Sequence, residues 1–362
     1  MYQKSKSVTV LLAAGGIAVA GAAIAQNAQP AQNAQPTRNA QPGAAPAQPA
    51  RWAAPGTPGS PIDGTIFHAQ VLLDQAGFSP GPIDGKPGIS LDDAVTGFQK
   101  SRGLPVTGKL DGPTRMALLQ NRAPSTRMLR VTPEDMEGPF VNPFPEKAED
   151  KAKLKFLAYR SPIEKLAEKF HTTPRTLAAL NRPDAQLRAG AVLRFPNVLP
   201  SSRQYGGLKP EHARLFSDLN VDANQPQGDR VVVDKSDRVL QVFDGDRLIA
   251  QFPVSMGSKR DPLPLGTWKI TTFAYLPPFN FQPDLLWYVS KDEKAQKLPP
   301  GPNGPVGVAW LDITKEHYGI HGTPEPQTLG RAESAGCIRM ANWDVLRLSR
   351  MIKAGTEAVF QA

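Results

Sequence analysis

Cysteine and histidine are scarce in this chain. Its 362 residues include one cysteine and five scattered histidines. A single cysteine excludes an intramolecular disulfide framework and a cysteine-cluster metal site. The scattered histidines argue against a structural zinc site. We therefore expect no metal centre.

Long apolar runs are absent after the first 25 residues. Lys4 and Lys6 precede an apolar run from Val8 to Ala25, which ends in the small-x-small pattern Ala23-Ile24-Ala25. This arrangement is typical of a cleaved signal peptide over residues 1–25. The alternative is an uncleaved anchor, because the run nearly reaches membrane-spanning length. We expect an exported protein of the periplasm or cell envelope, with transient membrane contact only if the signal is uncleaved.

Stretches that interleave basic and stacking aromatic residues are also absent, so we expect no nucleic-acid binding. The chain carries 42 Lys and Arg against 33 Asp and Glu, a net charge of +9. For an exported protein, this charge favours anionic envelope polymers or membrane surfaces as partners. The alternative is that the charge only maintains solubility.

Proline is abundant, at 37 of 362 residues, or about 10% against roughly 5% in average proteins. This content excludes a single compact α/β domain, and the length predicts two or three domains joined by linkers. Residues 26–61 contain eight prolines, three copies of Asn-Ala-Gln-Pro and no Leu, Ile, Val or Phe. Such a segment cannot form a core, so we expect a disordered, semi-rigid linker.

Helical spacing of apolar residues predicts a small three-helix domain over residues 62–120. Ser90 with Asp93 predicts a capping box at the start of its second helix. The segment resembles the bacterial peptidoglycan-binding module, which implies a peptidoglycan partner. The matching residues are Gln70, Leu73, Gly77-Phe78, Ile83-Asp84-Gly85, Ala94-Val95, Phe98-Gln99, Gly103-Leu104, Thr107-Gly108 and Thr114.

A second module is expected after a polar linker over residues 121–152. Within 153–198 we predict a strand at Phe156–Tyr159, two helices and a final strand at Val192–Pro196. This βααβ order resembles a LysM module, which implies binding to glycan strands that contain N-acetylglucosamine. The sequence departs from that family at Arg160-Ser161-Pro162, where LysM modules place Gly-Asp before the first helix.

From Arg230 onward the pattern becomes β-rich, with Asp244-Gly245 as a hairpin signal. A Pro/Gly-rich excursion over residues 277–305 carries the aromatic residues Phe279, Phe281, Trp287 and Tyr288. So long a loop in a compact domain is usually a functional lid or a disordered insert. The aromatic residues favour a lid.

The one cysteine, Cys337, lies sixteen residues after His321. A thiol is mostly protonated at neutral pH, and a neighbouring imidazole or cation such as Arg339 raises its thiolate fraction. Gly336 permits close backbone approach, so N–H groups around Cys337 are candidates to receive an oxyanion. The Gly322 carbonyl is a candidate to fix the imidazole tautomer. The alternative is a buried structural cysteine beside a satisfied histidine.

Two motifs decide between these readings: His321-Gly322-Thr323, and Ser334-x-Gly336-Cys337-Ile338-Arg339-Met340. They resemble the active-site signature of YkuD-type L,D-transpeptidases, and the likeness covers residues 229–362, including Pro264-x-Gly266 and Gly301-Pro302-x-Gly304-Pro305. The resemblance implies a mainly-β, sandwich-like catalytic domain that needs no cofactor and acts on peptidoglycan stem peptides. It implies that Cys337 is the nucleophile, His321 the general base and acid, and Gly322 the orienting carbonyl. Gly336 would help to form the oxyanion hole, while Ser334, Arg339 and Tyr318 would shape the site.

One position departs from that family: Ala335 stands where it usually has histidine. The change affects the acceptor or oxyanion side of the site. Two products therefore stay open: a 3,3 crosslink, from the donor bond after the third residue of the stem, and a 1,3 crosslink, from the bond after the first. By the same resemblance, the cysteine would form a thioester with the stem peptide. Attack on this thioester by water would give an L,D-carboxypeptidase, and attack by a protein amine would anchor a protein to the wall. A noncatalytic peptidoglycan-binding scaffold is the alternative from another class.

Overall fold

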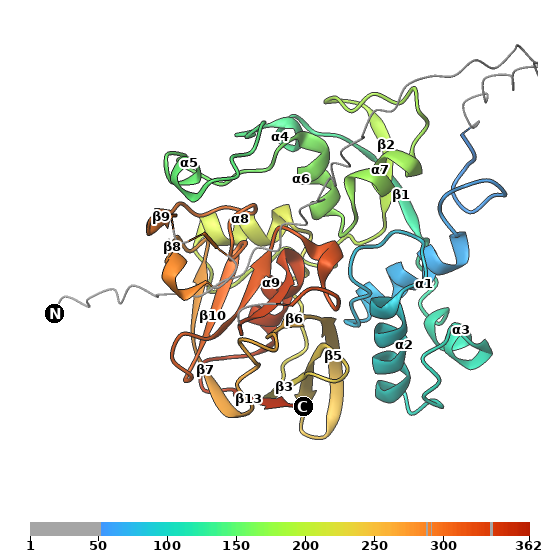
Figure 1. Ribbon diagram of the computed structural model, residues 1–362. Helices are drawn as coiled ribbons and strands as arrows, with labels where there is room; N and C mark the ends of the chain where they lie inside the picture. Colours follow the sequence, from blue (N-terminus) through green and yellow to red (C-terminus); the bar gives the residue numbers. More distant parts are fainter. Residues whose placement is uncertain (1–51, 287–288, 291, 334–335) are drawn as a thin grey trace, which may run out of the picture.

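The computed structural model describes residues 52–286, 289–290, 292–333 and 336–362 (Figure 1). The predicted signal peptide and residues 26–51 of the predicted linker lie outside the described residues. So do Trp287 and Tyr288 of the predicted lid, and Ser334 and Ala335 of the cysteine motif. Among the helices described, none is long and apolar enough to cross a membrane.

The N-terminal module contains the three predicted helices, which are α1 (Gly64–Gln75), α2 (Ile89–Ser101) and α3 (Gly112–Leu118). Asp63 caps α1 and Asp111 caps α3, each through a carboxylate oxygen that accepts backbone N–H groups. The predicted capping box of the second helix is wrong. This helix begins one residue before Ser90, and its cap, Gly88, makes no side-chain hydrogen bond.

The middle module is built on a two-stranded antiparallel sheet, in which β1 (Thr126–Arg130) pairs with β2 (Val192–Pro196). Four helices lie between the two strands: α4 (Pro133–Met136), α5 (Ala148–Ala152), α6 (Pro162–Lys169) and α7 (Pro174–Leu180). Ser161 caps α6 by accepting from the Glu164 N–H. The order β1-α6-α7-β2 is thus βααβ, with residues 131–160 inserted between the first strand and its helix.

Two sequence predictions are wrong in this module. Phe156–Tyr159 is not a strand, because its backbone bonds to loops instead: Leu157 N–H donates to Pro300 O at 2.8 Å. The partner of β2 lies in the segment over 121–152 that was predicted as a linker. That segment also buries Val131 and Ala148 against neighbouring modules, which its local polarity does not reveal.

The C-terminal domain is mainly β, as predicted. Its nine-stranded sheet has the order β5-β4-β3-β13-β7-β10-β11-β12-β6. The strands are β3 (Arg230–Asp234), β4 (Val239–Asp244), β5 (Arg247–Pro253), β6 (Ser255–Met256), β7 (Gly266–Tyr275), β10 (Ala309–Ile313), β11 (Gly319–Thr323), β12 (Ile338–Ala341) and β13 (Glu357–Gln361). The predicted hairpin with Asp244-Gly245 in its turn joins β4 to β5. The sheet is continuous and not two separate sheets. The first part of β7 pairs with β13 and its second part with β10, so β7 joins the two halves of the sheet.

Smaller elements flank this sheet. The helices α8 (Pro210–Asp218) and α9 (Asn342–Met351) lie beside it, and β8 (Phe279–Phe281) pairs with β9 (Gln296–Leu298) as a separate hairpin. Two short 3-10 helices complete the domain, η1 (Pro283–Leu285) and η2 (Pro326–Thr328).

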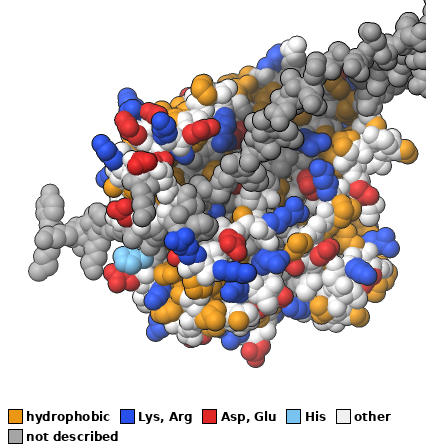
Figure 2. Space-filling view, in the orientation of Figure 1, with side chains coloured by type: hydrophobic (Ala, Val, Ile, Leu, Met, Phe, Trp, Pro, Cys, Tyr) orange, Lys and Arg blue, Asp and Glu red, His pale blue; other side chains and the backbone are white. Residues whose placement is uncertain are grey.

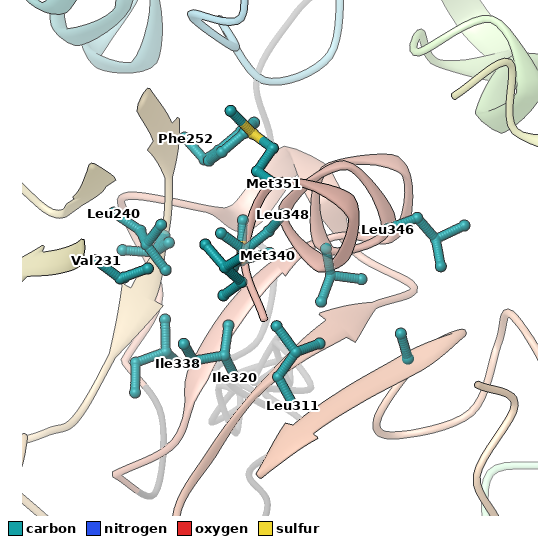
Figure 3. Packing of buried hydrophobic residues seen from close by; sticks show 14 of the residues in the cluster. Val231, Leu240, Phe252, Leu311, Ile320, Ile338, Met340, Leu346, Leu348 and Met351 are labelled. Carbon is teal, nitrogen blue, oxygen red and sulfur yellow. The ribbon is translucent and has the colours of Figure 1, made fainter. Parts of the chain in front are cut away.

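Strand alternation divides the side chains of the sheet between two faces. Leu311, Ile320, Ile338 and Met340 enter one core together with Val231, Leu240 and Phe252 from the other half of the sheet and with Leu346, Leu348 and Met351 from α9 (Figure 3). The residues between them, including Trp310, His321 and Arg339, project from the opposite face. The large core therefore fixes the strands that carry the candidate catalytic residues.

A buried polar cluster joins the three modules. Arg347 of α9 donates to Asp74 of α1 at 3.2 Å, and His171 Nδ1 lies 3.2 Å from the same carboxylate. Burial alone would raise the pKa of Asp74, but His171 and Arg347 outweigh it and hold the pKa below its usual value. The His171 ring also stacks on Trp343 of α9, with 5.0 Å between ring centres. One cluster thus joins all three modules.

Candidate active site

The candidate site lies on two neighbouring parallel strands, β11 and β12. His321 of β11 is opposite Arg339 of β12. Cys337 precedes Arg339 by two residues, so alternation directs its side chain to the same face. Both Cys337 and His321 are fully buried. The structure therefore brings the two predicted residues together on one face of the sheet.

His321 is held in one orientation by its neighbours. Its Nδ1 atom donates to the Gly322 carbonyl oxygen at 2.7 Å. Its ring stacks on Trp310 of the adjacent strand β10, with 5.4 Å between ring centres and 13° between planes. The Nε2 atom has no hydrogen-bond partner among the described residues. Since Nδ1 carries the proton in this arrangement, Nε2 has a lone pair that can accept another.

Cys337 lies in a dry environment. Its Sγ atom donates to the His317 carbonyl oxygen at 3.8 Å. It belongs to an apolar cluster with Ala148, Leu157, Phe279, Leu298, Val306 and Trp310. Ala148 and Leu157 come from the insertion in the middle module, while Phe279 and Leu298 come from the β8–β9 hairpin. We call these four residues, which pack in the same cluster as the thiol, the cover.

Burial sets the resting protonation of both groups. It raises the pKa of Cys337 to about 12, although the Gly319 N–H and Arg339 oppose this shift. It lowers the pKa of His321 to about 3, and the charge of Arg339 acts in the same direction. Arg339 thus acts on the thiol in the expected direction, but burial outweighs it and keeps the pKa of Cys337 high. The pair is a neutral thiol and a neutral imidazole, so nucleophilic attack requires proton transfer to His321.

Gly336 is required by its neighbour Tyr318. Its φ is +95°, and a Cβ atom there would lie 2.5 Å from the Tyr318 ring. Tyr318 is thus packed directly against the turn that presents Cys337. Burial raises the pKa of its hydroxyl, with the Cys337 charge acting in the same direction, so Tyr318 is neutral at physiological pH. Ser334, the other predicted site-shaping residue, lies outside the described residues.

The glycine-proline motif at 301–305 follows the β8–β9 hairpin and contacts the middle module at Leu157. Gly301 has φ +148°, and a Cβ atom there would lie 2.3 Å from the Leu157 carbonyl oxygen. The Asn303 N–H donates to the same oxygen at 3.0 Å. The motif therefore allows two backbones to meet where the cover is attached.

Sequence analysis missed several residues beside the pair. Trp310 stacks on His321, and Asp312 accepts from Trp310 Nε1 at 3.4 Å. Their signal was the two-residue alternation within Ala309–Ile313, which places both on the face of His321. Asn342 and Glu168, described below, had no local signal because they act across modules. Within the described ranges, no group of three or more His, Cys, Asp or Glu residues is arranged to hold a metal ion.

Comparisons with known proteins agree with this site. Residues 228–360 match the YkuD family, described as "L,D-transpeptidase catalytic domain". Residues 64–118 match a family described as "Putative peptidoglycan binding domain". Both resemblances drawn from the sequence are confirmed, whereas the LysM resemblance stays a prediction.

Individual relatives cover only part of the chain. "Putative L,D-transpeptidase YkuD" of Bacillus licheniformis is 35% identical over 127 residues, which span 35% of this chain and 62% of that protein. "Putative L,D-transpeptidase YqjB" of Bacillus subtilis is 28% identical over 36% of this chain and 69% of its own length. A solved L,D-transpeptidase from Mycobacterium smegmatis is 22% identical, with a TM-score of 0.31, over 36% of this chain and 58% of that one. This chain thus spans less than two thirds of the B. licheniformis relative, and its similarity to the YkuD family, described as "L,D-transpeptidase catalytic domain", lies at residues 228–360.

Proposed function

We propose that this protein is an L,D-transpeptidase that acts on peptidoglycan stem peptides. One observation carries the proposal: Cys337, directly before β12, and His321 of β11 project from the same face of the sheet, with Nδ1 of His321 bound to the Gly322 carbonyl. That hydrogen bond leaves Nε2 as the proton acceptor for the thiol. The match of residues 228–360 to the catalytic-domain family supports the same reaction.

The first half-reaction acylates the cysteine. Sγ of Cys337 attacks the carbonyl carbon that follows an L-centre of the donor stem, and the thiol proton moves to Nε2 of His321. Backbone N–H groups at Gly336 and Cys337 would stabilise the tetrahedral oxyanion. The C–N bond then breaks, and the imidazolium returns its proton to the departing D-residue amine. The products are a thioester and the departing D-residue with any residues that follow it, which for a tetrapeptide cleaved after its third residue is a free D-amino acid.

The second half-reaction transfers the acyl group. An amine of a neighbouring stem attacks the thioester and loses a proton to Nε2, and the sulfur leaves as a thiolate that recovers this proton. The donor bond that is cleaved decides the crosslink: cleavage after the third residue of the stem would give a 3,3 crosslink, and cleavage after the first would give a 1,3 crosslink. Water in its place would give a shortened stem, and a protein amine would give an anchored protein.

The other modules would hold the enzyme on the wall. The match of residues 64–118 to a peptidoglycan-binding family supports this role for the N-terminal module. The βααβ order of the middle module supports LysM-like glycan binding. Export to the periplasm or cell envelope, which the first 25 residues predict, would bring the enzyme to this substrate.

Surface charge suits an anionic wall polymer. Figure 2 shows Lys and Arg side chains gathered in the middle of one face of the molecule. A hollow of about 600 Å³ beside β6 is lined by Lys235, Arg238, Lys259 and Arg331, with Glu333 as its one acidic lining residue among those described. Such a surface attracts carboxylates.

Purified disaccharide-tetrapeptide provides the direct test. We expect the protein to convert it to a crosslinked dimer, and Cys337→Ala to form none. Fragmentation of the dimer by mass spectrometry would identify the crosslink. A Cys337-dependent loss of one residue without dimer would indicate a carboxypeptidase. Intact binding to cell-wall sacculi with no product from tetrapeptide, dimeric or protein-amine substrates would contradict the proposal and favour a scaffold.

A further inference from the structure

Asn342 is a fully buried residue at the start of α9, directly after the strand β12 that follows Cys337. Its side-chain oxygen accepts from the Val308 N–H at 3.1 Å. Its side-chain nitrogen donates to the Pro302 carbonyl at 3.2 Å and to Glu168 Oε1 at 2.8 Å. Both amide hydrogens are therefore used, and the amide has one defined orientation.

The oxygen of this amide lies directly against the backbone that orients His321. A Cβ atom at Gly322 would lie 2.1 Å from Asn342 Oδ1, and one at Gly307 would lie 2.0 Å from it. No other residue type fits at Gly322 while Asn342 keeps its place. Gly322 is also the residue whose carbonyl accepts from His321 Nδ1. Asn342 therefore packs against the backbone segment that holds the hydrogen-bond acceptor of the imidazole.

Glu168 connects this arrangement to another module. It lies in α6 of the middle module, is 8% exposed, and also accepts from the Tyr159 hydroxyl. Its two oxygens thus receive one donor from its own module and one from α9. A buried carboxylate with two satisfied oxygens is a rigid anchor for the Asn342 amide.

We propose that Asn342 is a positioning residue for His321, and that Glu168 of the middle module fixes the side-chain amide of Asn342. The connection runs from Glu168 through Asn342 and the Gly322 backbone to the imidazole. It makes the middle module a structural part of the catalytic site as well as a wall-binding unit. The inference rests on the proposed catalytic role of His321, but the position of its proton is measurable without any turnover.

The partners of Asn342 dictate which variants are informative. Asn342→Ala removes all three hydrogen bonds and the atom that contacts Gly322. Glu168→Ala removes one acceptor and leaves Asn342 able to rotate toward Pro302 alone. Glu168→Gln keeps an oxygen for the Asn342 amide, while its own amide can donate to the Tyr159 oxygen. Ser79→Ala is the matched control, because it removes a buried hydrogen bond of 2.7 Å to Asp344 of α9 without touching Asn342.

The test is ¹⁵N NMR of the full chain labelled at histidine, with His321 assigned by its loss in His321→Gln. We expect wild type, Ser79→Ala and Glu168→Gln to hold the proton on Nδ1 at pH 7. We expect Asn342→Ala and Glu168→Ala to give a mixture of the two tautomers. In transpeptidation assays the same two variants should lower kcat about tenfold to a hundredfold with little change in KM.

Two results would overturn the inference. A folded Asn342→Ala variant with wild-type His321 resonances would remove the role of Asn342. Wild-type resonances in Glu168→Ala would remove that of Glu168, and this variant decides the question if Asn342→Ala does not fold. A shifted tautomer in a protein that makes no crosslink would keep the inference and contradict only the proposed function.

Discussion

Burial has a larger effect than neighbouring charge on the pKa values of the residues in this site. Arg339 is close enough to lower the pKa of both Cys337 and His321, yet the thiol pKa is raised to about 12 because the sulfur is dry. Desolvation of a thiolate costs more than one neighbouring cation returns. The buried thiol is therefore protonated at neutral pH.

The lone thiol makes this protonation state measurable. We expect the rate of iodoacetamide modification to rise about tenfold per pH unit from pH 6 to 10, because the thiolate fraction rises in that way below the pKa. In the unfolded chain the rate should level off above about pH 9, since an ordinary thiol has a pKa near 8.5. Mass spectrometry of the modified protein gives both rates. A plateau below pH 9 in the folded protein would contradict the raised pKa.

Gly336→Ala tests the contact with Tyr318. The new methyl group would collide with the ring at 2.5 Å and carry an unfavourable φ. Gly355→Ala is the control, because Gly355 has φ +92° and no atom within 4 Å of the added Cβ. We expect each variant to lose about 1 kcal/mol of unfolding free energy from φ alone. Only Gly336→Ala should in addition abolish Cys337-dependent crosslinking, and equal activity of the two would show that the Tyr318 contact is dispensable.

Sequence patterns predicted the residues of this site unevenly. Cys337 and His321 were found because their motifs are contiguous. Trp310 was recoverable from strand alternation. Asn342 and Glu168 were not recoverable, because their hydrogen bond joins residues 174 positions apart. A single sequence carries no record of such a pairing.

At the scale of elements, the insertion between β1 and α6 has the largest effect on the site. It places Leu157 and Ala148 in the cluster around the sulfur and attaches to residues 300–303 by backbone hydrogen bonds. Its apolar residues are few and widely spaced, so the sequence predicted a linker there. Strand prediction failed at Phe156–Tyr159 for a related reason, since four apolar or aromatic residues describe a buried extended segment equally well.

Gly301→Ala should loosen the cover. Its methyl group would lie 2.3 Å from the Leu157 carbonyl, so the two backbones must separate. We expect iodoacetamide to modify Cys337 at least tenfold faster than in wild type at pH 8. The control is Gly190→Ala in the middle module, where φ is +85° and no atom lies within 4 Å of the added Cβ, and it should leave the rate unchanged. Equal rates in both variants would mean that this contact does not limit access to the sulfur.

At the scale of the whole molecule, three modules share one set of buried polar contacts. Asp74→Ala should cost up to about 3–5 kcal/mol of unfolding free energy, because it breaks a buried ion pair and leaves Arg347 with Asp344, at 3.6 Å, as its remaining carboxylate. Asp237→Ala is the control, since Asp237 joins the same two modules through an exposed pair with Lys100 at 3.9 Å. That pair should contribute less than about 1 kcal/mol. Urea unfolding measures both, and similar losses would contradict the assigned role of the cluster.

Glu168 should make the stability of the assembly pH-dependent. Burial raises its pKa to about 7, with Tyr159, Asn342 and His171 acting in the opposite direction and Glu164 reinforcing the rise. A carboxyl whose pKa is raised on folding stabilises fully below its unfolded pKa, and this stability is lost as pH rises through 7. We therefore expect Glu168→Gln to gain stability over wild type between pH 4.5 and 7.5. Parallel pH profiles of the two proteins would contradict this expectation.

Rigid docking of the modules has a consequence for where on the wall the enzyme works. The cluster of Asp74, His171 and Arg347 fixes the distance and angle between each module and the thiol. Under the proposed function, a glycan strand held by the modules would present its stems to Cys337 at a fixed spacing. We expect the spacing of crosslinks along a strand to follow the geometry of the protein, and lengthening the protein between its modules to change that spacing.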